Sequence, residues 1–324
     1  MLTNTTRPLA LKLRGHIKAA FLAGVVLLAP VSASAQTVTT YATGTAKPFS
    51  FSFDRGGRLY VGQFGEDIVW RVPAGGGSAT AFVTGTPGFG LGGVIGPDDA
   101  FYVPNVEGEV YRYAPGSTTP GGQPYATGFG SLLNGLAFDD AGRLYGVSTG
   151  TPRQIASVAS GGGVASTVCI LPSESYAMVI SDAGKPLAIS GQDSVIYQCD
   201  GSTVTVFANN IPGESNSLSK DRLGNIYYAL SGGPNFGEIY RIPSQGGGST
   251  RVAKVQADII GLVFNNDDLY AGDYSRGAVL RFANVAPSPT PTPVPTLTEW
   301  AMILFAMMLA GGAALHLQRR RQFA

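Results

Sequence analysis

The chain has 324 residues, of which 13% are charged, 45 are glycine and 21 are proline. Residues 36–298 carry 15 lysine and arginine residues against 20 aspartate and glutamate residues, a net charge of −5, which argues against a basic surface for nucleic acid. The high glycine content and the low charge favour strands and tight turns over helices, and about 250 residues suffice for one all-β core.

The first 35 residues have the organisation of a secretory signal peptide. The basic segment contains Arg7, Lys12, Arg14 and Lys18. An apolar run at residues 19–29 follows, and Ala33 and Ala35 form a small-x-small cleavage pattern that predicts Gln36 as the first mature residue. The alternative is an uncleaved anchor, but an apolar run of about eleven residues is too short to cross a bilayer roughly 30 Å thick. The sequence therefore predicts export.

A pattern of about 42 residues occurs six times between Phe49 and Phe282. Each copy has an apolar run, an Asp/Gly turn, a Leu-Tyr-like pair and a further apolar strand. The second position of the pair is occupied by Tyr60, Tyr102, Tyr145, Leu187, Tyr227 and Tyr270. A fixed period built of short strands predicts a six-bladed β-propeller with four antiparallel strands in each blade, at residues 36–284.

The first copy shows how each blade is expected to fold. Alternating apolar residues with Asp/Gly punctuation are the signal for successive hairpins. Strands are expected at residues 50–53, 59–62, 68–72 and 81–84. Aromatic residues recur at fixed places in these strands and could form a ligand platform. Their regular spacing favours packing between neighbouring blades instead.

The last copy ends at Phe282 without a fourth strand. Residues 40–44 (Thr-Tyr-Ala-Thr-Gly) resemble the fourth strands at residues 81–85 and 124–128. The N-terminal strand is therefore expected to complete the sixth blade, which would close the ring and cover an exposed strand edge.

Histidine and cysteine limit the chemistry of this domain. His16 and His316 are the only histidines, and both lie outside residues 36–284. A Ser-His-Asp or Cys-His catalytic arrangement and a histidine-rich metal site are therefore excluded. Cys169 and Cys199 are the only cysteines. In an exported protein they can form a disulfide, although two separate buried thiols remain an alternative.

Polar residues gather in the loops that lead into the inner strands, on the side expected to face the central tunnel. They are Asn134, Glu174, Glu214, Asn216 and Asp258. Carboxylate and amide oxygens that converge on one axis would suit Ca²⁺, which takes six to eight oxygen ligands. The alternative is that these residues cap turns at a solvated rim, which is the commoner role of such side chains.

The C-terminal segment has three parts. Residues 285–298 form a proline- and threonine-rich linker, which favours an extended polyproline spacer. Residues 299–318 are predicted to form a transmembrane helix, with Trp300 at one membrane interface. The basic tail at residues 319–324 would then lie on the cytoplasmic side, because it begins with Arg319, Arg320 and Arg321.

This tail resembles the IPTL-CTERM sorting signal of Gram-negative bacteria, with valine where that motif usually has isoleucine. The residues that carry the resemblance are Val294, Pro295, Thr296, Leu297, Glu299 and Trp300. The resemblance implies recognition by an exosortase-type enzyme at the inner membrane, cleavage near the motif and delivery to the outer surface. An ordinary single-pass anchor is the alternative, and both would hold the propeller outside the inner membrane.

The repeat itself resembles NHL repeats and the gluconolactonase and virginiamycin B lyase propellers, which share a repeat pattern but not one chemistry. The lyase family depends on histidine, which this domain lacks. Gluconolactonase-type propellers hold a metal with a Glu/Asn/Asn/Asp set, and the Asn134-Gly135 step resembles theirs. We therefore favour a surface-displayed binding module for an unknown ligand or protein. A Ca²⁺-dependent, lactonase-like hydrolase is the alternative.

Overall fold

The computed structural model describes residues 37–85, 93–213, 215–287 and 304–312. The predicted signal peptide, most of the linker with the sorting motif, and the basic tail lie outside the described residues. Within the predicted transmembrane segment, residues 304–312 are helical. Among the described residues, no helix has the length and hydrophobicity needed to cross a membrane.

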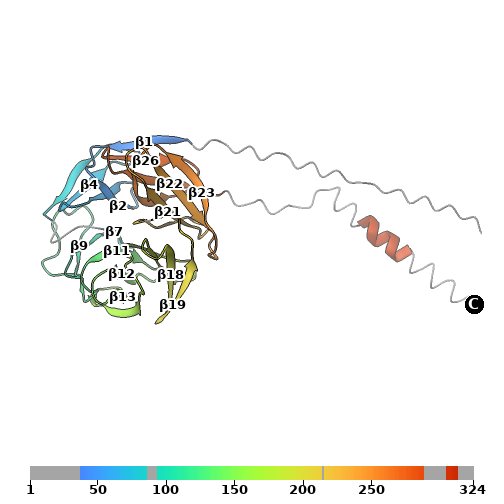
Figure 1. Ribbon diagram of the computed structural model, residues 1–324, viewed down its shortest axis with the longest axis horizontal. Coiled ribbons are helices and arrows are strands. Elements are labelled where there is room, and N and C mark those ends of the chain that lie inside the picture. Colours follow the sequence, from blue (N-terminus) through green and yellow to red (C-terminus); the bar gives the residue numbers. More distant parts are fainter. Residues whose placement is uncertain (1–36, 86–92, 214, 288–303, 313–324) are drawn as a thin grey trace, which may run out of the picture. The chain divides into compact units, whose positions relative to one another are not determined.

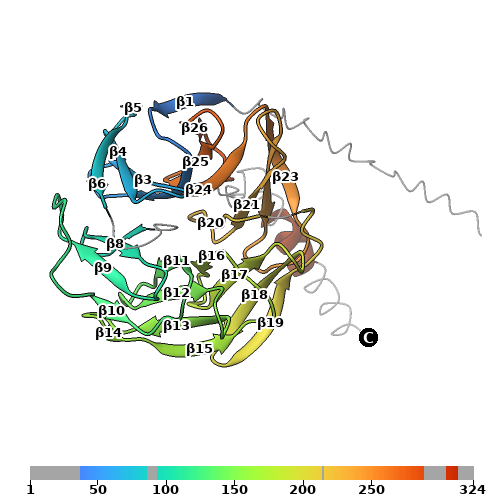
Figure 2. The same ribbon diagram turned by 60° about the vertical axis from the view of Figure 1, so that its left-hand side comes forward.

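The strands form six sheets arranged around a central axis, which confirms the predicted propeller (Figures 1 and 2). Blade 1 contains β2 (Pro48–Phe53), β3 (Leu59–Gln63), β4 (Ile68–Val72) and β6 (Thr80–Thr84). Blade 2 contains β7 (Val94–Ile95), β8 (Phe101–Pro104), β9 (Val110–Tyr113) and β10 (Ala126–Thr127). Blade 3 contains β11 (Leu133–Phe138), β12 (Leu144–Ser148), β13 (Gln154–Val158) and β15 (Ser166–Ile170).

The second half of the ring repeats this plan. Blade 4 contains β16 (Ala177–Ile180), β17 (Pro186–Ser190), β18 (Val195–Asp200) and β19 (Thr203–Ala208). Blade 5 contains β20 (Ser219–Lys220), β21 (Ile226–Ser231), β22 (Gly237–Ile242) and β23 (Thr250–Val255). Blade 6 contains β24 (Ile259–Asn265), β25 (Asp268–Asp273), β26 (Ala278–Phe282) and, from the other end of the chain, β1 (Val38–Thr43).

Strand β1 closes the ring, as the sequence predicts. It pairs antiparallel with β26, from Val38 opposite Phe282 to Thr43 opposite Ala278 (Figure 1). The first described strand and the last strand of the propeller therefore share one sheet. This pairing covers the edge that β26 would otherwise expose.

Glycine-rich turns in alternate blades join the preceding blade. The turn after β4 forms β5 (Gly77–Ser78), which pairs parallel with β1. The turn after β13 forms β14 (Gly163–Val164), which pairs parallel with β10. In blade 5 the backbone N–H of Gly247 donates to the carbonyl of Phe207 in β19, at 3.1 Å. In blades 1, 3 and 5 this turn is thus hydrogen-bonded to the outer strand of the preceding blade.

The middle glycine of each of these turns is required by a close backbone contact. A Cβ atom would lie 2.1–2.4 Å from a carbonyl oxygen of the preceding blade, nearer than atoms can approach. All three glycines also have φ between +85° and +96°, which disfavours residues with a side chain. They are Gly76, facing Tyr41; Gly162, facing Tyr125; and Gly246, facing Phe207.

Other contacts hold the remaining interfaces between blades. Between blades 3 and 4, Cys169 and Cys199 form a disulfide with their Cα atoms 6.2 Å apart, so the described residues contain no free cysteine. Between blades 5 and 6, the Arg222 guanidinium forms an ion pair with Asp267 at 2.5 Å. Between blades 1 and 2, the backbone N–H of Arg55 donates to the Asp99 carboxylate at 2.9 Å. Each interface therefore combines apolar packing with a specific link.

The conspicuous aromatic residues pack between blades, as expected from their spacing. In three interfaces the tyrosine of the Leu-Tyr pair meets a phenylalanine on the inner strand of the next blade, edge to face and with ring centroids 4.7–4.9 Å apart. The pairs are Tyr102 with Phe138, Tyr227 with Phe264, and Tyr270 with Phe53. Such pairs contribute about 0.5–1.5 kcal/mol each beyond the area that they bury.

The Asp turn before the Leu-Tyr pair organises each hairpin. In blade 5 the buried Asp221 carboxylate accepts backbone N–H groups of Leu223 and Asn225, and the Tyr227 hydroxyl at 3.0 Å. In blade 2 the Tyr102 hydroxyl donates to Asp98 at 3.0 Å, and burial raises the pKa of Tyr102 to about 12. The aspartate thus satisfies the donors of the turn and fixes the tyrosine for packing.

Candidate functional site

Six apolar side chains, one on or directly before the inner strand of each blade, form a ring around the propeller axis. They recur at nearly the blade spacing and are Phe51, Val94, Leu136, Met178, Leu218 and Leu262. These residues line two cavities, one of about 110 Å³ and one of about 590 Å³. We call the first, at the start of the inner strands, the upper cavity, and the second, at the end of these strands, the lower cavity. The ring is their common boundary.

A small residue precedes the ring residue in every blade. These positions are Ser50, Gly93, Gly135, Ala177, Ser217 and Gly261. At Gly261 a Cβ atom would lie 2.2 Å from the carbonyl oxygen of Phe49, so the inner strands of blades 6 and 1 approach too closely for a side chain there. The small residues let the six strands converge, and the upper cavity forms where they do.

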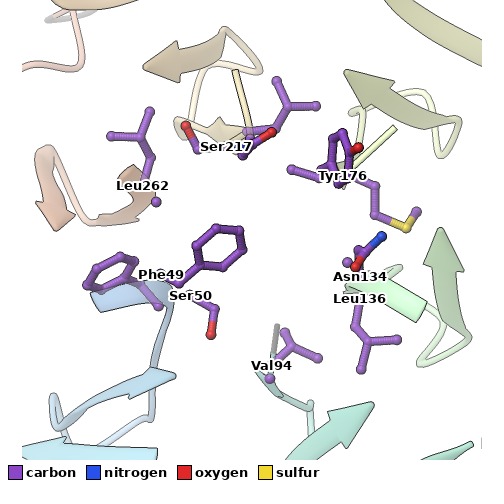
Figure 3. Close-up of a pocket in the computed structure, with 16 residues that line it drawn as sticks. Phe49, Ser50, Val94, Asn134, Leu136, Tyr176, Ser217 and Leu262 are labelled. Atoms are coloured by element: carbon purple, nitrogen blue, oxygen red, sulfur yellow. The ribbon is translucent and has the colours of Figure 1, made fainter. Parts of the chain in front are cut away.

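Uncharged polar and aromatic side chains surround the upper cavity (Figure 3). Asn134, Ser50 and Ser217 come from three different blades, and Phe49 and Tyr176 add aromatic rings. Among the described residues that line this cavity, none is acidic or basic. The site can therefore accept an uncharged polar group above an apolar floor.

Several hydrogen-bonding atoms of the upper cavity have capacity left for a ligand. Asn134 is buried and donates one hydrogen bond from Nδ2 to the Thr149 hydroxyl at 2.8 Å. The Ser50 hydroxyl is buried without a hydrogen-bond partner among the described residues. Ser217 Oγ accepts the Ala229 N–H at 3.2 Å, which leaves its own proton to donate. The Asn134 carbonyl oxygen and the Ser217 hydroxyl proton are therefore the groups of this wall with hydrogen-bonding capacity left for a ligand.

The structure brings together two of the five residues predicted as calcium ligands. Asn134 and Asn216 both line the upper cavity, at equivalent places in blades 3 and 5. Glu214 lies outside the described residues. Glu174 and Asp258 do not line the cavity. In the described part of the chain, no group of three or more acidic, histidine or cysteine side chains is arranged to hold a metal ion.

Glu174 and Asp258 are engaged in other contacts. Glu174 forms an ion pair with Arg153 at 3.6 Å and accepts the Tyr176 hydroxyl at 2.8 Å. Asp258 is only 8% exposed and accepts hydrogen bonds from Ser275, at 2.6 Å, and from Ser231. The described carboxylates therefore support neighbouring loops, and the amide oxygens alone do not provide the oxygen shell of a calcium ion.

Sequence reasoning did not identify Phe49, Ser50, Tyr176 and Ser217 as cavity residues. A signal for them was present, because a small residue followed by an apolar residue recurs at the start of each inner strand. The apolar residue of each pair belongs to the six-residue ring, and the residues just before it line the wall of the upper cavity.

Comparisons with known proteins agree with this fold. The IPTL-CTERM motif matches residues 292–321. No curated protein sequence matches the chain. Similar solved structures include a putative gluconolactonase with 11% identity and a TM-score of 0.61, over 76% of this chain and 92% of that chain. Regucalcin, a calcium-binding protein from Agrobacterium tumefaciens strain C58, has 14% identity and a TM-score of 0.59, over 76% and 95%.

A third similar structure is catalytically inactive virginiamycin B lyase from Staphylococcus aureus with quinupristin. It has 13% identity and a TM-score of 0.58, over 80% of this chain and 90% of that chain. At these identities the likeness shows the fold alone. The chain is thus a six-bladed β-propeller that carries an IPTL-CTERM sorting motif near its C-terminal end.

Proposed function

We propose that this protein is an exported propeller, sorted to the cell surface through its C-terminal motif, and that it acts there as a binding module. The ligand contacts the upper mouth of the axial tunnel. The observation that carries this proposal is the wall of the upper cavity, where uncharged hydrogen-bonding groups from several blades surround an apolar floor. The motif at residues 292–321 supports the location.

The residues of this wall favour a ligand whose inserted part is uncharged and polar and has a small apolar end. The Asn134 carbonyl can accept a hydrogen bond, and the Ser217 hydroxyl can donate one. A ligand that leaves these groups unpaired loses about 1–3 kcal/mol for each, so the site discriminates against purely apolar ligands. A volume of about 110 Å³ admits one substituent of a larger molecule, which would lie on the loops around the mouth.

Variants of the cavity wall test this function. The purified protein is passed over material extracted from the outer surface of the producing cells, and retention is compared with that of the Asn134→Ala and Asn216→Ala double variant. We expect the double variant to bind about 5- to 150-fold more weakly, because two hydrogen bonds of about 0.5–1.5 kcal/mol each are lost. Asn209→Ala, at an exposed position in the loop after β19, is the matched control. Equal retention of all three proteins would contradict the proposal.

A second candidate is a Ca²⁺-dependent, lactonase-like hydrolase. It is favoured by the meeting of Asn134 and Asn216 at one cavity, and by likeness in fold to a putative gluconolactonase and to calcium-binding regucalcin. In this function Glu214 would supply a carboxylate that the described donors lack. Calorimetry with Ca²⁺ on the wild type, Glu214→Ala and Asn216→Ala separates the two candidates. Binding lost in both variants supports the hydrolase, whereas no binding, or binding unchanged by either substitution, excludes it.

A further inference from the structure

The lower cavity is a second concave site, distinct from the one assigned above. At about 590 Å³ it has the size of cavities that hold small organic molecules. Apolar side chains such as Ile95, Phe138 and Ile180 form part of its wall below the six-residue ring. Its rim is formed by the turns that follow the inner strands of blades 3 and 4 and by the end of β20.

The rim of the lower cavity carries a surplus of negative charge. Its ionisable lining residues are Asp139, Asp140, Asp182 and Lys220. Lys220 is already paired with Asp182 at 2.7 Å. The Asp139 carboxylate accepts the backbone N–H groups of Ala141 and Arg143, and it also interacts with the Tyr145 hydroxyl, which the Arg143 side chain contacts as well. Asp140 is exposed and has no polar partner among the described residues.

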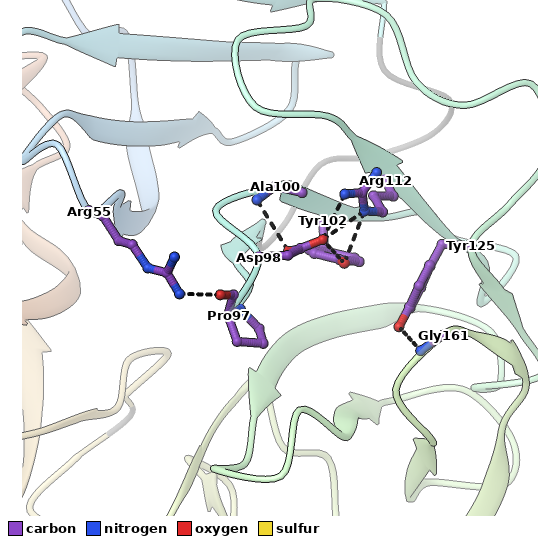
Figure 4. Close-up of polar contacts among 8 residues, drawn as sticks. All are labelled: Arg55, Pro97, Asp98, Ala100, Tyr102, Arg112, Tyr125 and Gly161. Atoms are coloured by element: carbon purple, nitrogen blue, oxygen red, sulfur yellow. Dashed lines mark hydrogen bonds and ion pairs between the residues drawn. The ribbon is translucent and has the colours of Figure 1, made fainter.

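The cations near this end of the propeller are engaged elsewhere. The Arg55 guanidinium donates to the carbonyl of Pro97, and Arg112 forms an ion pair with Asp98 at 2.7 Å (Figure 4). Arg143 does not line the lower cavity, and its side chain interacts with Tyr145. The remaining ion pairs on these turns and strands are Arg58 with Asp54, Lys185 with Asp200, Arg222 with Asp267 and Arg281 with Asp268. None of these cations neutralises Asp140.

We propose that the lower cavity binds an organic ammonium ion that has an apolar body. The apolar body packs against the six-residue ring and the walls around Phe138, and the ammonium group lies at the rim beside Asp140 and Asp139. The surplus negative charge of the rim carboxylates favours a cation over a neutral or anionic ligand at the mouth of the cavity. This site is independent of the upper cavity and of the function proposed for it.

Three probes with one apolar body test the charge requirement. They are 4-phenylbutylammonium, 4-phenylbutanol and 4-phenylbutyrate, each titrated into the purified protein by calorimetry at low salt. We expect the ammonium ion to bind about tenfold more tightly than the alcohol, and the carboxylate to show no binding. Methylammonium, which lacks the apolar body, should not bind. Equal affinity for the ammonium ion and the alcohol, or equal affinity for methylammonium, would overturn the proposal.

Substitutions at the rim locate the site. Asp140→Asn should weaken binding of 4-phenylbutylammonium about threefold, and Asp140→Lys by more than about tenfold, because an exposed charge contributes modestly and its reversal repels the ligand. Both changes are at an exposed position and should leave folding intact. The matched control is Glu66→Gln, an exposed carboxylate in the loop between β3 and β4, which should bind as the wild type does. Unchanged binding in Asp140→Lys, or no binding in the wild type, refutes the inference.

Discussion

The glycine turns that join alternate blades predict a specific stability defect. In Gly162→Ala the new Cβ atom would lie 2.1 Å from the Tyr125 carbonyl oxygen, so either the turn or β10 has to move. This movement would weaken two backbone hydrogen bonds between blades 3 and 2. The N–H of Gly163 donates to the Tyr125 carbonyl at 2.9 Å, and the N–H of Ala165 donates to the Thr127 carbonyl at 2.8 Å. The alanine must also adopt φ near +85°.

The expected loss follows from these two effects. A side chain in the left-handed region costs about 1–2 kcal/mol. Two weakened hydrogen bonds cost about 0.5–1.5 kcal/mol each. The free energy of unfolding should therefore fall by about 2–5 kcal/mol in total. In a domain of about 250 residues this corresponds to a decrease in Tm of about 4–20 °C.

Gly161→Ala is the matched control for the close contact. Gly161 has φ of +103°, but a Cβ atom there would meet no atom within 4 Å. It should suffer only the conformational cost of about 1–2 kcal/mol. Thermal unfolding followed by circular dichroism, with the disulfide intact in all proteins, measures the difference. If Gly162→Ala is no less stable than Gly161→Ala, the contact between blades does not contribute as we argue.

Two further predictions concern the disulfide between blades 3 and 4 and the contacts of Asp98 within blade 2. Replacing Cys169 and Cys199 by serine should lower the free energy of unfolding by about 3–4 kcal/mol, because the disulfide closes a loop with a sequence separation of 30. Denaturant unfolding measures this loss as a lower midpoint in the double variant than in the oxidised wild type. Equal midpoints would contradict the prediction. Asp98→Asn tests how the stability of the fold depends on pH. Burial alone would raise the pKa of Asp98, but hydrogen bonds from Arg112, Ala100 and Tyr102 outweigh burial and hold this pKa below its usual value of 3.8. The stability that this carboxylate provides is therefore present above pH about 4 and is lost as the pH falls through its folded-state pKa. The wild type should exceed Asp98→Asn in stability at neutral pH, and the gap should narrow in acid; a gap that is constant down to pH about 2 would refute the assignment.

The fold was predictable because each blade carries its own local signals. The Asp turn, the Leu-Tyr pair and alternating strands specify one hairpin after another, and residues 40–44 match the fourth strand of other blades. The parallel pairing of β5 with β1, and of β14 with β10, was not predicted. It depends on φ values and on contact between separate blades at glycines such as Gly162, and a run of glycines alone does not reveal either.

The candidate site was only partly predictable, for a related reason. Asn134 and Asn216 hold equivalent places in the repeat and line one cavity, since blade geometry fixes the position of the backbone. The direction of a side chain depends on local partners, and Arg153 holds Glu174 while two serines hold Asp258. These partners lie on other loops, where the repeat gives no guidance.

The intact mass of the protein recovered from producing cells tests both export and sorting through the C-terminal motif. We expect a polypeptide that begins at Gln36 and has lost the segment containing Arg319, Arg320 and Arg321. A protein that begins at Met1, or one that still ends with the basic tail at Ala324, would contradict this expectation.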